Sequence, residues 1–312
     1  MEKLRLALLA GGRSAEREVS LQGADGVEKA LDGGKYQITR YDPATDMEAI
    51  ARDAGAIDAA FILLHGLYGE DGTIQGFLEL LDIPYQGSGV LGSAIAMNKN
   101  LSKKIYRLNG LTVADWAMAE PRDINNPKQL LTRLDLPVVV KPVKQGSSVG
   151  MTIVREQGKL ADALKSAFDH DDEVMVEEYV KGRELTVGVI GNDNLLPLPL
   201  IEIIPDQRFD FFDYEAKYAP GASEEICPAD VGDNIREKAQ QWAVIAHRSL
   251  ELRGYSRTDM ILREDGELFV LETNTIPGMT PTSLFPQAAA EAGLPFPELL
   301  DHLIELALEG RG

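Results

Sequence analysis

Two carboxylates near the C-terminal end of the chain, Asp259 and Glu272, are spaced to face each other across a hairpin. They flank an Asp-Gly pair that is typical of a two-residue turn between antiparallel strands. If this pair forms the turn, Asp259 lies opposite Glu272, and Arg257 lies opposite Asn274 on the same face. Opposed carboxylates repel each other unless a positive charge lies between them. The oxygen donors of Asp259, Glu272 and Asn274 therefore predict a site for a hard divalent cation.

The alternative interpretation is a solvated hairpin face on which Arg257 neutralises a chance pair of carboxylates. We favour the cation site because the next pair in the same register, Ile261 and Val270, is apolar. Four polar groups therefore converge next to an apolar pair on the hairpin.

A second candidate is the loop from Lys141 to Gly150, in which a lysine ends a predicted strand and glycines and serines follow. Glycines let backbone N–H groups approach phosphate oxygens, and Lys141 supplies a positive charge beside them. The loop is not a Walker A motif, because its lysine precedes the glycines. From these residues alone, an ordinary flexible hairpin is an equally good interpretation.

Two further glycine-rich segments leave alternatives open. Gly11-Gly12-Arg13-Ser14 follows the first predicted strand and could hold an anion at a helix start, or Ser14 could simply cap the helix. Gly87–Gly92 fits the G-x-G-x-x-G dinucleotide pattern, but it does not follow the first strand. We interpret Gly87–Gly92 as a tight turn before a helix.

The elements that position these residues change in kind along the chain. Up to residue 108, strands (Leu4–Leu9, Ala59–Leu64) alternate with helical stretches (Ser20–Leu31, Ile74–Leu81, Ser93–Leu108), which indicates a parallel sheet covered on both faces. Strands are then expected at Val138–Lys141, Met151–Val154 and Val174–Val180, with a helix at Gly158–Phe168. A helix at Asn234–Leu252, the hairpin Arg257–Asn274, a Pro-rich loop at Pro277–Pro286 and a helix at Pro297–Glu309 follow.

Composition and charge exclude several classes of protein. The chain has 312 residues, with 31 Lys+Arg against 50 Asp+Glu and a net charge of −19, which argues against nucleic acid and anionic membrane surfaces as partners. The longest apolar runs, such as Ala59–Leu64, are too short to span a membrane. The N-terminus lacks the long apolar stretch of a signal peptide, and the single cysteine, Cys227, excludes an intrachain disulfide. We expect a cytoplasmic protein.

The ordered set of motifs resembles the D-alanine–D-alanine ligases of the ATP-grasp superfamily over essentially the whole chain. The matching segments are Gly11–Ser20, His65–Gly76, Met97–Lys99, Lys141–Gly150, Glu177–Val180, Gly182–Glu184, Asp213–Tyr218, Arg257–Asp259 and Glu272–Thr280 with Ser283. Two positions depart from the family pattern. Asn98 replaces the usual aspartate of Met-Asp-Lys, and Gly23 replaces a common serine.

This resemblance implies an α/β fold, α+β overall, of the ATP-grasp type. It implies an N-terminal α/β domain at 1–98, a central subdomain at 99–182 and a C-terminal subdomain at 183–312, with ATP between the last two. By the resemblance, the residues that bind ATP are Lys99, Lys141, Glu177, Glu178, Tyr179, Val180, Glu184, Phe211 and Lys217. Asp259, Glu272 and Asn274 would bind Mg²⁺ or Mn²⁺, in agreement with the hairpin argument.

The resemblance also implies the amino-acid sites and the reaction, an ATP-dependent joining of two D-alanines through an acyl phosphate in peptidoglycan precursor synthesis. The residues around the first D-alanine would be Glu16, Val19 and His65, and those around the second Ser283 and Leu284. Arg257 and the Gly278 N–H would form the oxyanion hole, and Glu16, Ser147 and Tyr218 a hydrogen-bonded triad that closes a lid. The family is commonly dimeric, so we expect a homodimer.

Three other activities remain open from the sequence. A ligase of the same fold could take D-lactate, D-serine or another amino acid as second substrate, although Tyr218 favours D-alanine by the resemblance. A dinucleotide-dependent oxidoreductase would have to use Gly87–Gly92. A non-catalytic nucleotide-binding module would require a broken metal or oxyanion constellation, and the sequence contains no such break.

Overall fold

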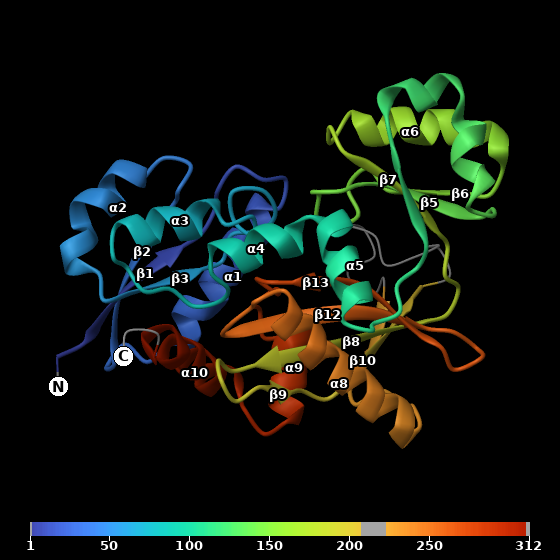
Figure 1. Cartoon of the computed structure of the whole chain (residues 1–312). Coiled ribbons are helices and arrows are strands. Elements are labelled where there is room, and N and C mark those ends of the chain that lie inside the picture. Colours follow the sequence, from blue (N-terminus) through green and yellow to red (C-terminus); the bar gives the residue numbers. More distant parts are fainter. Residues whose placement is uncertain (1, 207–222, 310–312) are drawn as a thin grey trace.

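The computed structural model describes residues 2–206 and 223–309, and this part of the chain contains three β-sheets (Figure 1). One sheet is parallel and two are antiparallel. Each of the three segments expected from the sequence holds one of these sheets. No helix in the described ranges is long and apolar enough to cross a membrane.

The N-terminal sheet has the order β2-β1-β3 and is parallel throughout. Its elements are β1 (Leu4–Leu9), α1 (Arg17–Ala30), β2 (Tyr36–Tyr41), α2 (Met47–Asp53), β3 (Ala59–Ile62), α3 (Thr73–Leu80) and α4 (Val90–Met97). Leu6 and Leu8 of β1 point to the core under α1, whereas Ala7 and Leu9 point to the core under α2 and α3. The prediction of a parallel sheet covered on both faces is confirmed. Strand β2 was not predicted, because most of its central residues are polar and all of them are at most partly buried at the sheet edge.

The central sheet is antiparallel and has the order β4-β7-β5-β6. It follows α5 (Lys99–Leu108) and consists of β4 (Trp116–Ala119), β5 (Val138–Pro142), β6 (Thr152–Val154) and β7 (Val174–Glu178), with α6 (Leu160–Phe168) before β7. Alternate residues of β5 and β7, such as Val138, Val140 and Val176, pack against α6. The other face of the sheet is therefore left for a ligand pocket.

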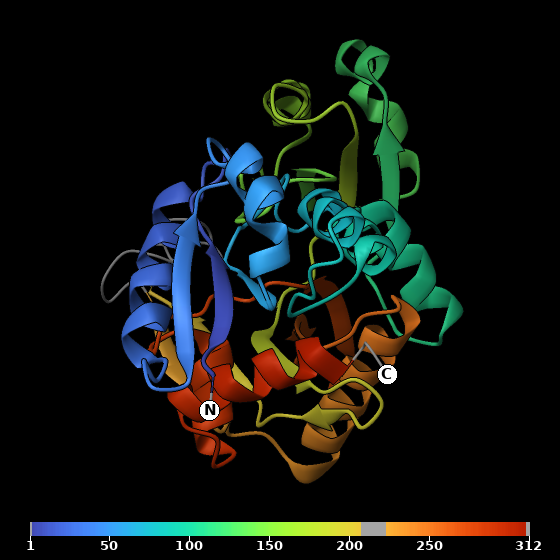
Figure 2. The ribbon, with the colours of Figure 1, turned by 90° about the vertical axis from the view of Figure 1, so that its left-hand side faces the viewer.

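The C-terminal sheet has the order β11-β10-β8-β12-β13, with β9 paired to β8. Its elements are β8 (Arg183–Ile190), β9 (Leu196–Pro197), β10 (Ile201–Pro205), β11 (Ser223–Ile226), α8 (Asp233–Ser249), β12 (Tyr255–Leu262), β13 (Leu268–Asn274), α9 (Leu284–Glu291) and α10 (Phe296–Glu309). Helix α8 packs on one face of this sheet through a row of alanines. Helix α10 returns to the N-terminal sheet, where it contacts α1 and β3 (Figure 2).

The segment 93–108 forms two helices rather than one, and the break lies at Asn98. This residue is extended (φ −89°, ψ 98°), and its Oδ1 accepts a hydrogen bond from the N–H of Leu101 at 3.0 Å, which caps α5. Asparagine caps a helix about as well as aspartate does. The departure from the usual Met-Asp-Lys pattern therefore keeps the geometry that sets the direction of Lys99.

The functional pairs of the β12–β13 hairpin have the predicted register, with Arg257 opposite Asn274 and Asp259 opposite Glu272. The predicted two-residue turn is wrong. The N–H of Arg263 bonds the carbonyl of Glu267 at 2.9 Å, so the loop has three residues and ends at Gly266, whose φ is +84°.

The extra loop residue shifts the register near the turn, so Ile261 faces Phe269 and not Val270 as predicted. A bulge between Asp259 and Met260 restores the register at the polar pairs. The longer loop and the bulge shift the register in opposite directions. The predicted pairing of Asp259 is therefore correct although the predicted turn is not.

The Gly87–Gly92 segment packs against residues 250–255, just after α8. Gly87 has φ +88°, and Gly89 precedes α4. A Cβ on Gly92 would lie only 2.8 Å from the carbonyl oxygen of Glu251, so the glycine is required where α4 meets the end of α8. This agrees with the interpretation as a turn before a helix.

Candidate active site

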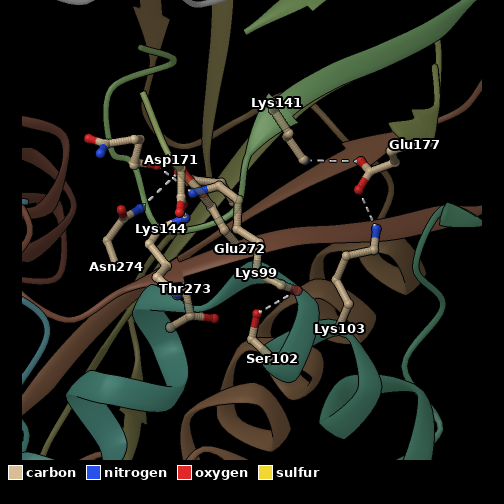
Figure 3. Close-up of polar contacts among 12 residues, drawn as sticks. Lys99, Ser102, Lys103, Lys141, Lys144, Asp171, Glu177, Glu272, Thr273 and Asn274 are labelled. Atoms are coloured by element: carbon tan, nitrogen blue, oxygen red, sulfur yellow. Dashed lines mark hydrogen bonds and ion pairs between the residues drawn. The ribbon is translucent and has the colours of Figure 1, made fainter. Parts of the chain in front are cut away.

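One pocket lies between the central and C-terminal sheets, and the nucleotide-site residues predicted in the described ranges line it. They are Lys99, Lys141, Glu177, Glu178, Tyr179, Val180 and Glu184, together with Ser147, Asp259 and Glu272. Lys141 lies near the end of β5 and Glu177 near the end of the neighbouring strand β7, opposite Val139. Their side chains meet, with Lys141 Nζ 3.2 Å from Glu177 Oε1 (Figure 3).

The predicted glycine-serine loop joins β5 and β6 at this pocket and is anchored at two points. The N–H of Lys144 donates to Asp171 Oδ2 at 2.6 Å, and Lys99 Nζ donates to the carbonyl of Gln145 at 2.7 Å. Ser147 and Ser148 adopt left-handed conformations, with φ of +47° and +58°. These conformations are uncommon for residues with a Cβ, and at this position they turn Ser147 toward the N-terminal domain.

The two carboxylates of the proposed cation site are each bound to a separate cationic side chain. Arg257 donates to both oxygens of Asp259 at 2.9 and 2.8 Å, and Asn274 Nδ2 donates to Asp259 Oδ2 at 3.0 Å. Lys99 Nζ lies 3.1 Å from Glu272 Oε2. In the described ranges no three His, Cys, Asp or Glu side chains cluster as a metal site. The donors still fit Mg²⁺, since two carboxylates and an amide oxygen are hard ligands that share one face of the hairpin.

A second pocket adjoins the first and is lined by every residue predicted to bind amino acids that lies in the described ranges. These residues are Glu16, Val19, His65, Ser147, Arg257, Gly278, Ser283 and Leu284. The hydroxyl of Ser147 donates to Glu16 Oε1, so two of the three proposed triad members are in contact across domains. Tyr218, like Phe211 and Lys217, lies outside the described residues.

The segment from Ile276 to Ser283 forms the wall of this second pocket nearest to Arg257. Ser283 precedes α9, and its Oγ accepts from the N–H of Thr280 at 3.1 Å. A Cβ on Gly278 would lie 3.1 Å from Ser283 Oγ, so the glycine allows a close approach. Helix α9 itself was missed, because its residues were assigned in part to the Pro-rich loop.

His65 and Glu70 form the other wall, and burial dominates their ionisation. Desolvation lowers the pKa of His65 even though the charge of Glu16 acts in the opposite direction. Desolvation, together with the charge of Glu16, raises the pKa of Glu70 to about 7. Glu70 was not predicted as a site residue, although the polar, glycine-rich character of residues 65–72 is a signal in the sequence.

Lys103 is the other residue that sequence reasoning missed. It is fully buried, and its Nζ lies 2.7 Å from Glu177 Oε2. Lys103 follows Lys99 by four residues, so both side chains lie on one face of α5. That spacing could have indicated Lys103 as a neighbour of the site.

The two pockets share Ser147, and the Arg257–Asp259 ion pair connects their linings. A nucleotide phosphate in the first pocket would therefore lie beside a carboxylate bound in the second. Two antiparallel sheets that enclose a lysine-lined pocket, after a parallel N-terminal sheet, define the ATP-grasp class of fold.

Comparison with known proteins identifies the family within this class. The model described as D-ala D-ala ligase C-terminus matches residues 105–305, and the model described as D-ala D-ala ligase N-terminus matches residues 40–88. The chain belongs to the D-alanine–D-alanine ligase family. Among curated relatives, it is 59% identical to the D-alanine–D-alanine ligase of Desulfotalea psychrophila (99% of this chain, 96% of that one) and 58% identical to that of Syntrophobacter fumaroxidans (99% of each).

Solved structures show the same likeness over the whole chain. The D-alanine–D-alanine ligase of Bacillus anthracis complexed with ATP has a TM-score of 0.86 and 35% identity, covering 99% of this chain and 98% of that one. The VanG D-Ala:D-Ser ligase of Enterococcus faecalis has a TM-score of 0.85 and 32% identity, covering 98% of this chain and all of that one.

Proposed function

We propose that this chain is an ATP-dependent ligase that joins two D-alanines into D-alanyl-D-alanine, with release of ADP and phosphate. The observation that carries the proposal is the adjacency of the two pockets through Ser147 and Arg257. A nucleotide site and an amino-acid site that share a wall can bring a γ-phosphate to a carboxylate and exclude water from the acyl phosphate that forms. The family membership supplies the identity of the amino acid.

The reaction proceeds in two steps. A carboxylate oxygen of the first D-alanine attacks the γ-phosphorus, the bond to the β-phosphate oxygen breaks, and ADP and an acyl phosphate form. The second D-alanine, after its ammonium group loses a proton, attacks the acyl carbon. The tetrahedral intermediate then expels phosphate, and loss of the remaining extra proton leaves the amide.

Six residues of the second pocket take the roles that the family resemblance implies. Glu16, held by Ser147, binds the ammonium group of the first D-alanine. Arg257 and the N–H of Gly278 stabilise the oxyanion, and a single such donor is typically worth about 3 kcal/mol. Ser283 and Leu284 receive the second D-alanine at the start of α9.

In the nucleotide pocket, Lys99 and Lys141 counter the phosphate charge. These cations are local, because the chain as a whole carries −19. Asp259, Glu272 and Asn274 would hold Mg²⁺ or Mn²⁺, which would neutralise charge on the transferring phosphoryl group. We also propose that the enzyme works in the cytoplasm as a homodimer, for which light scattering is the direct test.

The decisive test is phosphate release from ATP across a panel of D- and L-amino acids, with D-serine and D-lactate included. We expect release that depends on D-alanine, and D-alanyl-D-alanine as the product by mass spectrometry. Release that depends on L-amino acids alone would contradict the proposal. A mixed product formed preferentially with D-serine or D-lactate would show that one of these compounds, and not D-alanine, is the second substrate.

A further inference from the structure

Three charged side chains form a buried cluster beside the nucleotide pocket. The carboxylate of Glu177 lies between two lysines, with Lys103 Nζ 2.7 Å from Oε2 and Lys141 Nζ 3.2 Å from Oε1 (Figure 3). Lys103 and Glu177 have side-chain exposures of 0% and 4%. A lysine is almost never buried to this extent unless an ion pair offsets the cost of its desolvation.

The two lysines lie on different sides of the carboxylate. Lys141 and Glu177 line the nucleotide pocket, whereas Lys103 does not. Lys103 reaches Glu177 from α5, and its Nζ lies 5.1 Å from the ring centre of Trp116. Trp116 is the cross-strand neighbour of Glu177 on β4, so Lys103 is enclosed between a helix and the sheet. Lys103 thus binds the oxygen of Glu177 directed away from Lys141.

The cluster is charged near neutral pH. Burial lowers the pKa of Lys103 to about 8, with Glu177 acting in the opposite direction. Burial alone would raise the pKa of Glu177, but the charges of Lys103 and Lys141 outweigh it and leave this pKa below its ordinary value. Glu177 is therefore an ionised carboxylate, which accepts hydrogen bonds and donates none.

We propose that Lys103 is a positioning residue for nucleotide selection, which holds Glu177 so that Oε1 faces the pocket as an obligatory acceptor. The inference rests on the proposed ATP-dependent function and names how its nucleotide is chosen. An acceptor at this place pairs with a purine that carries an exocyclic amine, as adenine does. A purine with a carbonyl group there would place two acceptors against each other and leave both unpaired.

Besides holding Glu177, Lys103 affects how Lys141 interacts with the nucleotide. Because Lys103 already neutralises Glu177, Lys141 is not the only counter-charge of that carboxylate. Lys141 can then turn to the phosphates without leaving a buried, unpaired anion. Without Lys103, Lys141 would be held more tightly by Glu177, and the interaction of Lys141 with the nucleotide would weaken.

The test compares Lys103→Met with Lys104→Met, the adjacent exposed lysine of the same helix. Lys103→Met is expected to fold, because Glu177 keeps Lys141 as a partner. The measurements are Kd for Mg²⁺-ATP and Mg²⁺-ITP by calorimetry, and kcat and KM in the phosphate-release assay. ITP serves as the probe because it carries a carbonyl in place of the exocyclic amine.

For Lys103→Met we expect Kd and KM for ATP to rise about tenfold or more, and the preference for ATP over ITP to fall by a similar factor. The KM for D-alanine should stay within about twofold of the wild-type value, as should every value for Lys104→Met. A lower kcat and melting temperature with an unchanged ATP/ITP ratio would overturn the proposal, because that is the result of a purely structural role. Wild-type protein that binds ATP selectively but shows no D-alanine-dependent turnover would refute the proposed function and not this inference.

A double-mutant cycle keeps the inference testable if Lys103→Met does not fold. Glu177→Gln leaves Lys103 buried beside a neutral amide in place of its anionic partner, whereas Glu177→Gln combined with Lys103→Met removes both charges. If Lys103 acts through Glu177, the double variant should bind ATP as well as Glu177→Gln or better. A double variant that binds ATP several-fold more weakly than Glu177→Gln would show that Lys103 acts by another route and overturn the proposal.

Discussion

The carboxylate of Glu70 joins the N-terminal domain to the backbone of the oxyanion segment. One oxygen accepts from the N–H of Gly66 at 2.9 Å, and the other accepts from the N–H of Ile276 at 3.2 Å. Ile276 lies two residues before Gly278, whose N–H is the proposed oxyanion donor. A side chain of the N-terminal domain therefore fixes the position of a segment that belongs to the C-terminal domain.

Glu70→Ala should disturb this segment more than Glu70→Gln. Alanine leaves both N–H groups without their acceptor, whereas glutamine keeps one acceptor oxygen, and each unpaired buried donor costs about 1–3 kcal/mol. We expect Glu70→Ala to lower kcat and raise the KM for D-alanine while the Kd for ATP changes little. Steady-state kinetics and ATP titration check this, with Glu48→Gln, at an exposed position in α2, as control. Equal losses in ATP binding and turnover would argue against a local effect on Gly278.

Ser147→Ala removes the hydroxyl that donates to Glu16. A hydrogen bond to a charged group is worth about 1.5–3 kcal/mol, so the KM for D-alanine should rise about tenfold or more. Ser148→Ala is the matched control. Ser148 also has a left-handed backbone conformation, but of the two pockets it lines only the nucleotide pocket. If both variants change the KM for D-alanine equally, the contact between Ser147 and Glu16 has no specific role in binding the amino acid.

Glu272→Gln tests the cation site. From the sequence we expected the two carboxylates of Asp259 and Glu272 to repel each other. In the structure each carboxylate has its own cationic partner. Without nucleotide, the variant should therefore be no more stable than the wild type. Loss of the partly exposed Lys99 pair should change the free energy of unfolding by at most about 1 kcal/mol. Mg²⁺-ATP should stabilise the wild type strongly and the variant weakly, since a ligand of the native state raises stability by mass action.

Melting curves with and without Mg²⁺-ATP measure this difference, and phosphate release should fall about a hundredfold. Glu264→Gln, in the exposed turn of the same hairpin, is the control and should behave as the wild type. Equal nucleotide-induced shifts in Glu272→Gln and the wild type would exclude Glu272 as a metal ligand.

The sequence could predict many of the strands and helices in their order, because alternating apolar runs and glycine turns are local signals. It could also place Asp259 opposite Glu272, although only through the mutual cancellation of a longer turn and a bulge. Gly266 is compatible with a two-residue or a three-residue turn, and no single residue marks the bulge. Strand β2 and helix α9 escaped prediction because polar edge positions and a proline-rich start resemble loops.

The contacts between residues far apart in the sequence could not be predicted from sequence periodicity alone. Lys103 and Glu177 are 74 residues apart, and Glu70 and Ile276 are 206 residues apart. Which pairs meet is decided by how helices and sheets pack in three dimensions, and no local pattern encodes that packing. The resemblance to a ligase family supplied the ligand residues, but it did not supply these positioning contacts.

His247 makes stability depend on pH away from the active site. It is fully buried in α8, its Nδ1 lies 2.8 Å from Ser256 Oγ, and its Nε2 has no hydrogen-bond partner in the described part of the chain. Desolvation lowers the pKa of His247 to about 4. The unfolded chain therefore takes up a proton at higher pH than the folded one. The stability from a neutral His247 is present above about pH 6.5 and is lost as the pH falls from there toward 4.

Between pH 7 and pH 5 this linkage should lower the free energy of unfolding by about 2 kcal/mol. Urea unfolding of wild type and His247→Gln at the two pH values measures the effect, and the variant should lose about 2 kcal/mol less than the wild type does over this interval. His302→Gln, at a partly exposed position on α10, should keep the wild-type difference. An identical loss in wild type and His247→Gln would show that other groups carry the acid sensitivity, and that the folded protein accommodates a proton on His247.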